Sequence, residues 1–153
     1  MLVLNDDVEL ARYIGAPAVH LGLGDMPVAD ARKRLGPGVW IGGTANTPEQ
    51  VQKRIDEGVD CIGLGPWRHT GTKKNLSPVL GAEGVRLALQ AISPAQDAGA
   101  LQKVPVYVIG GIVPADVHAI LALGATGVAL SSSIVAGPDI EKNLNAYQSA
   151  LKG

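Results

Sequence analysis

The run CIGLG at residues 61–65 is apolar apart from its glycines and lies between an aspartate and a proline. It is too short for a helix, and its apolar residues are nearly continuous rather than alternating with polar ones. Such a run is typical of a strand buried on both faces, as in a parallel sheet. Five further runs share this pattern: MLVL (1–4), AVHLG (18–22), VWIGG (39–43), VYVIGG (106–111) and GVALSSS (127–133). The sequence therefore predicts six strands in a parallel arrangement.

Segments with helical spacing separate these runs. Residues 47–58 (TPEQVQKRIDEG) begin with a capping residue and Pro48 at the first helical position, and Gly58 ends the segment. Segments with similar helical spacing lie at residues 6–16, 26–36, 81–92 and 113–125. Residues 93–103 are predicted to form a longer irregular connector. The alternation of strands and helices predicts a parallel sheet with right-handed crossovers.

The β-α units resemble one another. EGVDCIGLGP (57–66) and LGATGVALSS (123–132) each join a helix-ending glycine to a glycine-bearing strand. Such units, repeated, build a TIM (βα)₈ barrel, and a doubly wound sheet is the other candidate. A complete barrel needs about 200 to 250 residues, whereas this chain has 153. We therefore expect one domain over residues 1–153, either an open six-stranded sheet or a TIM-type barrel lacking two units.

The composition excludes several classes of protein. The chain is 46% hydrophobic and 18% charged, with a net charge of -1. It gives no reason to expect binding to nucleic acid or to an anionic membrane. No apolar run approaches the roughly 18 residues of a spanning helix, and the acidic start MLVLNDDVEL is unlike a signal peptide. Cys61 is the single cysteine, so no disulfide framework exists, and we expect a cytoplasmic protein.

Polar, charged or flexible residues follow the predicted strands, whose carboxyl ends should meet at one rim. They are Asn5, Asp6, Asp7, Asp25, Thr44, Asn46, the loop GPWRHTGTKKN at 65–75, Gly110, Gly111, and the serines 131–133. The glycine and serine turns each precede a helical segment, where backbone N–H groups favour an anion such as phosphate. The alternative is that the glycines only form a tight turn and the serines only cap a helix.

Asp6 and Asp25 follow neighbouring strands. Two carboxylates with water and substrate oxygens suit Mg²⁺, although each could instead cap its following helix. Asp7 is expected to be a helix cap or solvated.

Other polar and aromatic residues receive structural interpretations. We expect His20 to pack in the core or bond to a neighbour, and Arg32 to lie solvated on a helix face. Trp67 is expected to pack in the core or to line the pocket.

Along nearly its whole length the chain resembles the thiamine-phosphate synthase family. The motifs that carry the resemblance are LVLNDD, VHLGLGD, IGGTANT, HTGTKKN, VIGGI and SSSI, in that order. The resemblance implies a (βα)₈-barrel enzyme that joins hydroxymethylpyrimidine diphosphate to thiazole phosphate and releases pyrophosphate, with Mg²⁺ as cofactor. Its substrates are small molecules.

The resemblance also implies roles for single residues. It places Asn5 on the pyrimidine side, Asp6 and Asp25 on Mg²⁺, and Thr44 and Lys73 as catalytic residues. The further substrate-binding positions are Thr70 and Thr72 for the diphosphate, and Gly110, Gly111, Ser132 and Ser133 for the thiazole phosphate. A fixed lysine and Mg²⁺ would stabilise the charge on the departing diphosphate, so the expected chemistry is dissociative.

The chain also departs from the family pattern. The family has two further βα units before the point that corresponds to Met1, and a Gln-x-Arg-x-Lys motif that holds the diphosphate; no strand end of this sequence shows that motif. Unpaired sheet edges would favour association, with a second copy or with a complementing chain. The alternative functions are a thiazole tautomerase-like paralogue and a phosphate-binding protein without catalysis.

Overall fold

A computed structural model describes residues 1–71, 78–97 and 104–152, in which six parallel strands form one open sheet. The strands are β1 (Leu4–Asn5), β2 (Ala18–Leu21), β3 (Trp40–Ala45), β4 (Cys61–Leu64), β5 (Val106–Ile109) and β6 (Gly127–Ala129). Each strand pairs in parallel with the next in the sequence, and β1 and β6 each have one neighbour in the described part. The predicted α/β class with six parallel strands is confirmed, and the sheet is not closed into a barrel.

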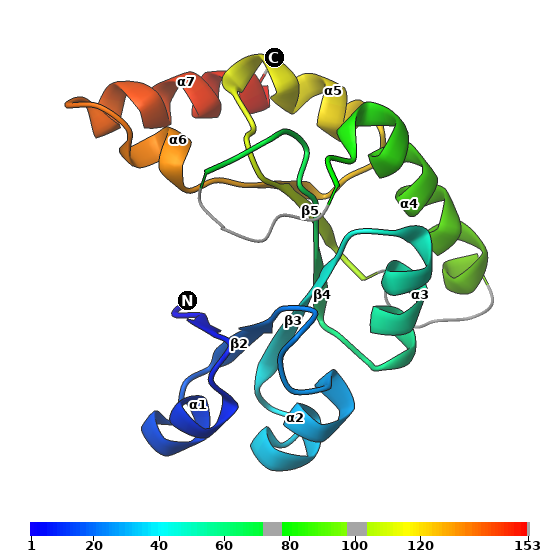
Figure 1. Ribbon diagram of the computed structural model, residues 1–153. Coiled ribbons are helices and arrows are strands. Elements are labelled where there is room, and N and C mark those ends of the chain that lie inside the picture. Colours follow the sequence, from blue (N-terminus) through cyan, green and yellow to red (C-terminus); the bar gives the residue numbers. More distant parts are fainter. Residues whose placement is uncertain (72–77, 98–103, 153) are drawn as a thin grey trace.

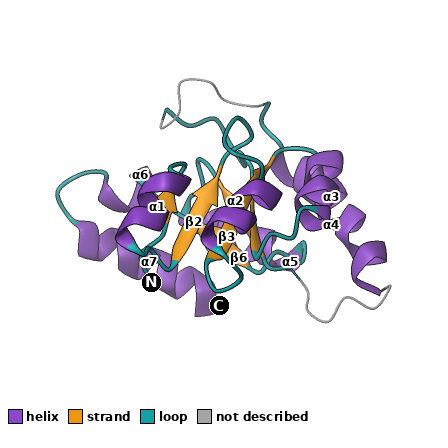
Figure 2. Ribbon diagram, turned by 90° about the horizontal axis from the view of Figure 1, so that it is seen from below, coloured by secondary structure: helices purple, strands orange, loops and turns teal. Residues whose placement is uncertain are grey.

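The helices cover the outer side of the curved sheet (Figure 1), and a second view shows the strands inside them (Figure 2). They are α1 (Val8–Ile14), α2 (Val28–Leu35), α3 (Pro48–Asp56), α4 (Gly81–Asp97), the 3₁₀ turn η1 (Pro114–Asp116), α5 (Val117–Ala122), α6 (Ser132–Val135) and α7 (Ile140–Lys152). Over the described ranges, no helix has the length and apolar character needed to cross a membrane.

Helix ends follow the predicted chemistry. Asp7 caps α1 and accepts a hydrogen bond from the N–H of Leu10 at 2.9 Å. Thr47 caps α3 in the same way, with Pro48 as the first helical residue. Gly58 follows α3 with a φ of +77°, a left-handed conformation that glycine adopts without steric cost. These capping residues fix where α1 and α3 begin, and the glycine fixes where α3 ends.

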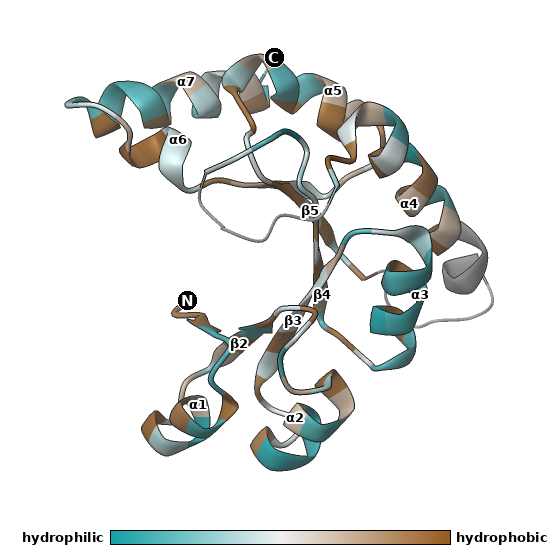
Figure 3. Ribbon diagram, viewed as in Figure 1, coloured by the Kyte–Doolittle hydropathy of each residue, from teal (hydrophilic) through white to brown (hydrophobic). Residues whose placement is uncertain are grey.

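The core lies between the sheet and the helices. Fully buried residues of the central strands, among them Leu21, Ile41, Leu64 and Val108, belong to the same hydrophobic cluster as helix residues such as Val51. Figure 3 shows apolar colouring along the central strands and a mixture of polar and apolar residues along the helices. Burial against the helices explains the apolar residues on the outer face of these strands.

Three element boundaries differ from the sequence predictions. β1 begins only at Leu4, since this edge strand pairs through Leu4 and Asn5 alone. β3 extends to Ala45, so Thr44 lies inside the strand rather than after it. α4 continues to Asp97, so the predicted irregular connector is wrong for residues 93–97, and 98–103 lie outside the described residues. The helix thus includes Ser93 and Pro94, although proline disfavours the interior of a helix.

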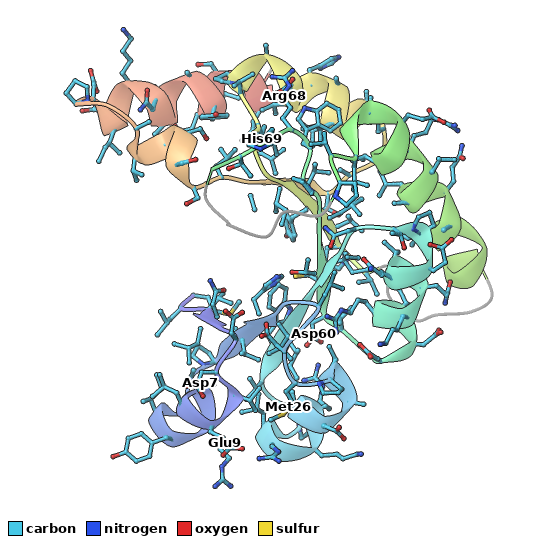
Figure 4. The ribbon with its side chains drawn as sticks, viewed as in Figure 1. Asp7, Glu9, Met26, Asp60, Arg68 and His69 are labelled. Atoms are coloured by element: carbon cyan, nitrogen blue, oxygen red, sulfur yellow. The ribbon has the colours of Figure 1, made fainter. Side chains whose placement is uncertain are left out.

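Arg32 corrects the expectation of a solvated helix face. Its guanidinium donates to the carbonyl oxygens of Val39 and Gly58 and to Asp60, whose Oδ2 lies 2.5 Å away. Asp60 also accepts from the N–H of Ile41 at 2.6 Å. Figure 4 shows Asp60 between α2 and the central strands. Arg32 is only partly exposed because it ties α2 to the start of β3 and β4.

We expect Leu64→Ala to lower the free energy of unfolding by about 2 to 5 kcal/mol, because it opens a cavity in the core. Leu64 is 0% exposed in the middle of the sheet. The matched control is Leu87→Ala on α4, where the side chain is 45% exposed, and its effect should stay within about 0.5 kcal/mol. Urea unfolding measures both values, and equal losses would contradict this description of the core.

Candidate functional site

A cavity of about 730 Å³ is lined by residues from all six strands or from the loops that follow them. Of the candidate residues, Asn5, Asp6, Asp25, Thr44, Thr70, Gly110, Gly111, Ser132 and Ser133 line it. The structure thus brings together at one cavity the candidates that lie in its described part. Thr72 and Lys73 lie outside the described residues.

The backbone after β2 holds the carboxylate of Asp25. Its Oδ2 accepts a hydrogen bond from the N–H of Gly22 at 2.6 Å. A Cβ atom at Gly22 would lie 2.9 Å from this same oxygen, so any side chain there would displace the carboxylate. The bond fixes one carboxylate oxygen of Asp25 to the turn after β2.

Asp6 has an unusual backbone conformation at the end of β1. Its φ is +66°, and it is the one non-glycine residue with positive φ in the described part of the chain. Aspartate tolerates this region better than most residues. The Asp6 N–H donates to the carbonyl oxygen of His20 at 2.9 Å, which continues the pairing of β1 with β2 past the strand end. The conformation therefore places Asp6 at the rim beside β2.

His20 lies in the cavity and bonds to Thr44. The His20 Nε2 and the Thr44 Oγ1 are 2.9 Å apart, and Thr44 is 8% exposed. The expectation that His20 bonds to a neighbour agrees with this contact, but sequence analysis missed that the ring lines the cavity. The available signal was the two-residue period of a strand, which puts His20 on the face opposite Val19 and Leu21.

The Gly110-Gly111 turn packs against the loop that follows β4. Both glycines have positive φ, +89° and +66°, and added Cβ atoms would lie 2.7 Å from Pro66 Cβ and 2.9 Å from Arg68 Cβ. The N–H of Arg68 donates to the carbonyl oxygen of Gly110 at 3.0 Å. Both the tight turn and the close packing require glycine here, so these two glycines have a structural role irrespective of any bound phosphate.

An ion pair joins the same two loops. The Arg68 Nη2 lies 2.5 Å from Asp116 Oδ1, and Asp116 also accepts from the N–H of Val113 at 2.9 Å. Asp116 is 6% exposed. Figure 4 shows Arg68 and His69 on the side of the molecule that carries α5, far from Asp7. The pair anchors the start of the loop that continues into Thr70.

Two further residues near the cavity have structural roles. Trp67 is 6% exposed and belongs to the core, and it is not among the residues that line the cavity.

Burial, with a smaller contribution from the charge of Asp60, raises the pKa of the Cys61 thiol to about 11. The neutral thiol is therefore the favoured form of Cys61 near pH 7.

The oxygen donors of the cavity suit a hard cation with few protein ligands. Over the described ranges, no cluster of three or more His, Cys, Asp or Glu residues could hold a metal ion. Asp6 and Asp25 remain as two carboxylates at the ends of neighbouring strands, both lining the cavity. Mg²⁺ is commonly held by one or two carboxylates, with water and substrate phosphates completing its shell. The donor set therefore fits Mg²⁺ and not a site built from protein ligands alone.

Fold and cavity together define a TIM-barrel-type α/β protein with a site at the carboxyl ends of its strands. The family model described as thiamine monophosphate synthase matches residues 1–134. The chain belongs to this family, which confirms the resemblance deduced from the motifs.

Individual relatives agree with the family match. A thiamine-phosphate synthase of Bacteroides fragilis is 48% identical over 139 residues, covering 91% of this chain and 66% of the relative. One of Flavobacterium psychrophilum is 47% identical over 132 residues, covering 86% of this chain and 62% of the relative. A solved thiamine phosphate pyrophosphorylase from Pyrococcus furiosus superposes with a TM-score of 0.78 at 26% identity, covering 98% of this chain and 66% of that one. The chain thus spans slightly less than two thirds of the length of these relatives.

Gly22→Ala tests the turn that holds Asp25. Because the added Cβ would overlap the Asp25 carboxylate, we expect a loss of about 1 to 3 kcal/mol in the free energy of unfolding. Gly24→Ala in the same turn is the control, since a Cβ there would meet no atom within 4 Å and its φ is not positive. If urea unfolding gives the same stability for both variants, the described Gly22–Asp25 contact is wrong.

Proposed function

We propose that this chain provides the active site of a thiamine-phosphate synthase, a transferase that couples hydroxymethylpyrimidine diphosphate to thiazole phosphate and releases pyrophosphate. The observation that carries the proposal is the meeting of the family's motifs, separated in the sequence, around one cavity. The names of the relatives support the same reaction. We further propose a single TIM-type domain over residues 1–153 that works in the cytoplasm, either with a second copy of itself or with a complementing chain.

Asp6 and Asp25 are the proposed ligands of Mg²⁺. The fixed turn at Gly22 leaves Asp25 Oδ1 outside that hydrogen bond, and Asp6 lies at the adjacent strand end. When bound, Mg²⁺ would supply positive charge to the diphosphate as it departs. Asn5 is proposed to bind the pyrimidine ring, and the Thr44 hydroxyl, whose geometry is set by His20, to contact the same substrate.

The loop after β4 is the proposed site of the diphosphate. Thr70 lines the cavity, and the motif continues through Thr72 and Lys73. Threonine hydroxyls can donate to phosphate oxygens, and a lysine ammonium stabilises the negative charge that develops on the leaving group. Gly110, Gly111, Ser132 and Ser133, which follow β5 and β6, are the proposed ligands of the thiazole phosphate through their backbone N–H groups and hydroxyls.

The proposed reaction exchanges one bond for another at the pyrimidine methylene. The bond from this carbon to the diphosphate oxygen breaks, and its electron pair leaves with pyrophosphate. The thiazole nitrogen then donates its lone pair to the cationic methylene and forms the new C–N bond. No proton moves at the reacting atoms, so positioning and charge stabilisation supply the rate enhancement, and no acid–base residue is required.

The direct test is pyrophosphate release by the purified chain with both substrates and Mg²⁺, with thiamine phosphate as the second readout. Product formation supports the proposal. A folded sample that forms no product yet binds thiazole phosphate would overturn it in favour of a phosphate-binding protein without catalysis. Calorimetric titration of thiazole phosphate supplies that distinction.

Lys73→Ala should lower turnover by about 10²- to 10³-fold, because the leaving group loses its fixed positive charge. Binding of thiazole phosphate, measured by calorimetry, should stay nearly unchanged. Lys74→Ala removes the same charge one residue further along and serves as the control, with turnover close to that of the unaltered chain. Turnover unaffected by Lys73→Ala would exclude its role on the leaving group.

Asp25→Asn should raise the Mg²⁺ concentration needed for half-maximal turnover by about tenfold or more, because one anionic ligand is lost. Asp7→Asn is the matched control, since asparagine caps a helix as well as aspartate does and Asp7 caps α1. The measurement is a Mg²⁺ titration of pyrophosphate release. Identical titrations for Asp25→Asn and the unaltered chain would refute the ligand assignment.

A further inference from the structure

Arg54 is a buried cation behind the rim of the cavity. It lies on α3, is 5% exposed, and does not line the main cavity. Its guanidinium has three partners from three parts of the chain. The Nε donates to the Thr44 carbonyl oxygen at 3.0 Å, the Nη2 to the Gly22 carbonyl oxygen at 2.8 Å, and the Nη1 to Glu57 at 2.9 Å. None of the motifs that carry the family resemblance includes Arg54.

Both carbonyl contacts fall on residues that orient site side chains. The Thr44 carbonyl lies on the residue whose hydroxyl bonds to His20, and the Gly22 carbonyl lies on the residue whose N–H holds Asp25. One planar guanidinium therefore joins the end of β3 to the turn after β2. An arginine can hold two such acceptors at once because its donors form a rigid fork.

The chain makes room for this side chain at Gly43. A Cβ atom there would lie 2.9 Å from Arg54 Cδ and 3.1 Å from Arg54 Nε. The aliphatic part of Arg54 thus passes directly over the backbone of β3 on the face that the helices cover. Glu57, whose side chain is 15% exposed, supplies the opposite charge that a buried guanidinium needs.

We propose that Arg54 is a positioning residue that fixes the Asp25 turn relative to Thr44, and so the pyrimidine diphosphate and Mg²⁺ half of the site. This inference rests on the proposed function for its kinetic consequences. Arg54 touches no substrate in this proposal. It acts through the backbone of Gly22 and Thr44, and it makes no hydrogen bond to the Gly110-Gly111 turn.

The test compares Arg54→Met with Lys53→Met. Lys53 is on the same helix, also pairs with Glu57 and is 72% exposed, so its replacement removes a charge without touching the two carbonyls. In Arg54→Met, kcat/KM for hydroxymethylpyrimidine diphosphate should fall about tenfold or more, as expected for a small misplacement of site groups. The half-saturating Mg²⁺ concentration should rise about tenfold. The Kd for thiazole phosphate should stay within about twofold, and Lys53→Met should change none of these values.

Arg54→Lys covers the case in which Arg54→Met does not fold. An ammonium keeps the charge but cannot hold both carbonyls in the fork geometry, so the same selective loss is expected. The proposal would be overturned if the affinity for thiazole phosphate fell by as much as kcat/KM for hydroxymethylpyrimidine diphosphate. Equal losses would indicate general destabilisation of the protein.

Backbone NMR separates this inference from the proposed function. If the unaltered chain forms no thiamine phosphate, the proposed function fails, and the positioning role is judged from the amide shifts of each variant. Shifts at residues 22–25 and 44–46 that appear in the Arg54 variants and not in Lys53→Met support it. Shifts confined to α3 would overturn it.

Discussion

The site depends on the absence of side chains at two consecutive positions of β3. A Cβ atom at Gly42 would lie 2.6 Å from the His20 ring, and one at Gly43 would lie 2.9 Å from Arg54. Because successive residues of a strand face opposite sides, Gly42 admits the histidine on the cavity side and Gly43 admits the arginine on the helix side. Both polar side chains then converge on Thr44, one through its hydroxyl and the other through its carbonyl oxygen. Glycines within a strand cost conformational entropy, and here that cost is offset by the bonds that both neighbours make.

Much of the architecture could be predicted, because the sequence patterns that mark each strand and each helix end lie within that element. Continuous apolar runs indicated parallel strands, and the caps at Asp7 and Thr47 marked helix starts. Parallel pairing in sequence order then brings the strand ends to one rim, so the candidates from β1 to β6 had to lie close together. The family motifs added roles that spacing alone did not give. Those roles remain predictions for Asn5, Asp6, Asp25 and the other candidates, because placement around a cavity does not measure binding.

Local signals failed where contacts between distant residues decide the outcome. Sequence alone assigned Arg32 to solvent and predicted no role for Arg54, yet both side chains donate to carbonyl oxygens in or beside the strands. The reach of an arginine side chain lets it bury its stem and still find acceptors, and no periodicity reveals which acceptors are near. α4 shows the same limit, since this helix continues to Asp97 through Ser93 and Pro94, where the sequence predicts an irregular connector. The position of His20 in the cavity was missed for a different reason, because its face of the strand was predictable but the space that Gly42 leaves for its ring was not.

Two separate sets of polar contacts support the loops around the cavity, one on each side of it. Arg54 links the turn after β2 with β3, whereas the pair of Arg68 with Asp116 links the loops after β4 and β5. Between the halves lie the β3–β4 ladder and a hydrogen bond from the Asn46 side chain to the Gly65 carbonyl oxygen. A reaction that joins two bound substrates requires a fixed distance between their sites, since the gain from proximity is lost if either site shifts. In the proposed reaction each half would orient its own ligand, and the β3–β4 ladder with the Asn46–Gly65 hydrogen bond would set the distance between the two ligands.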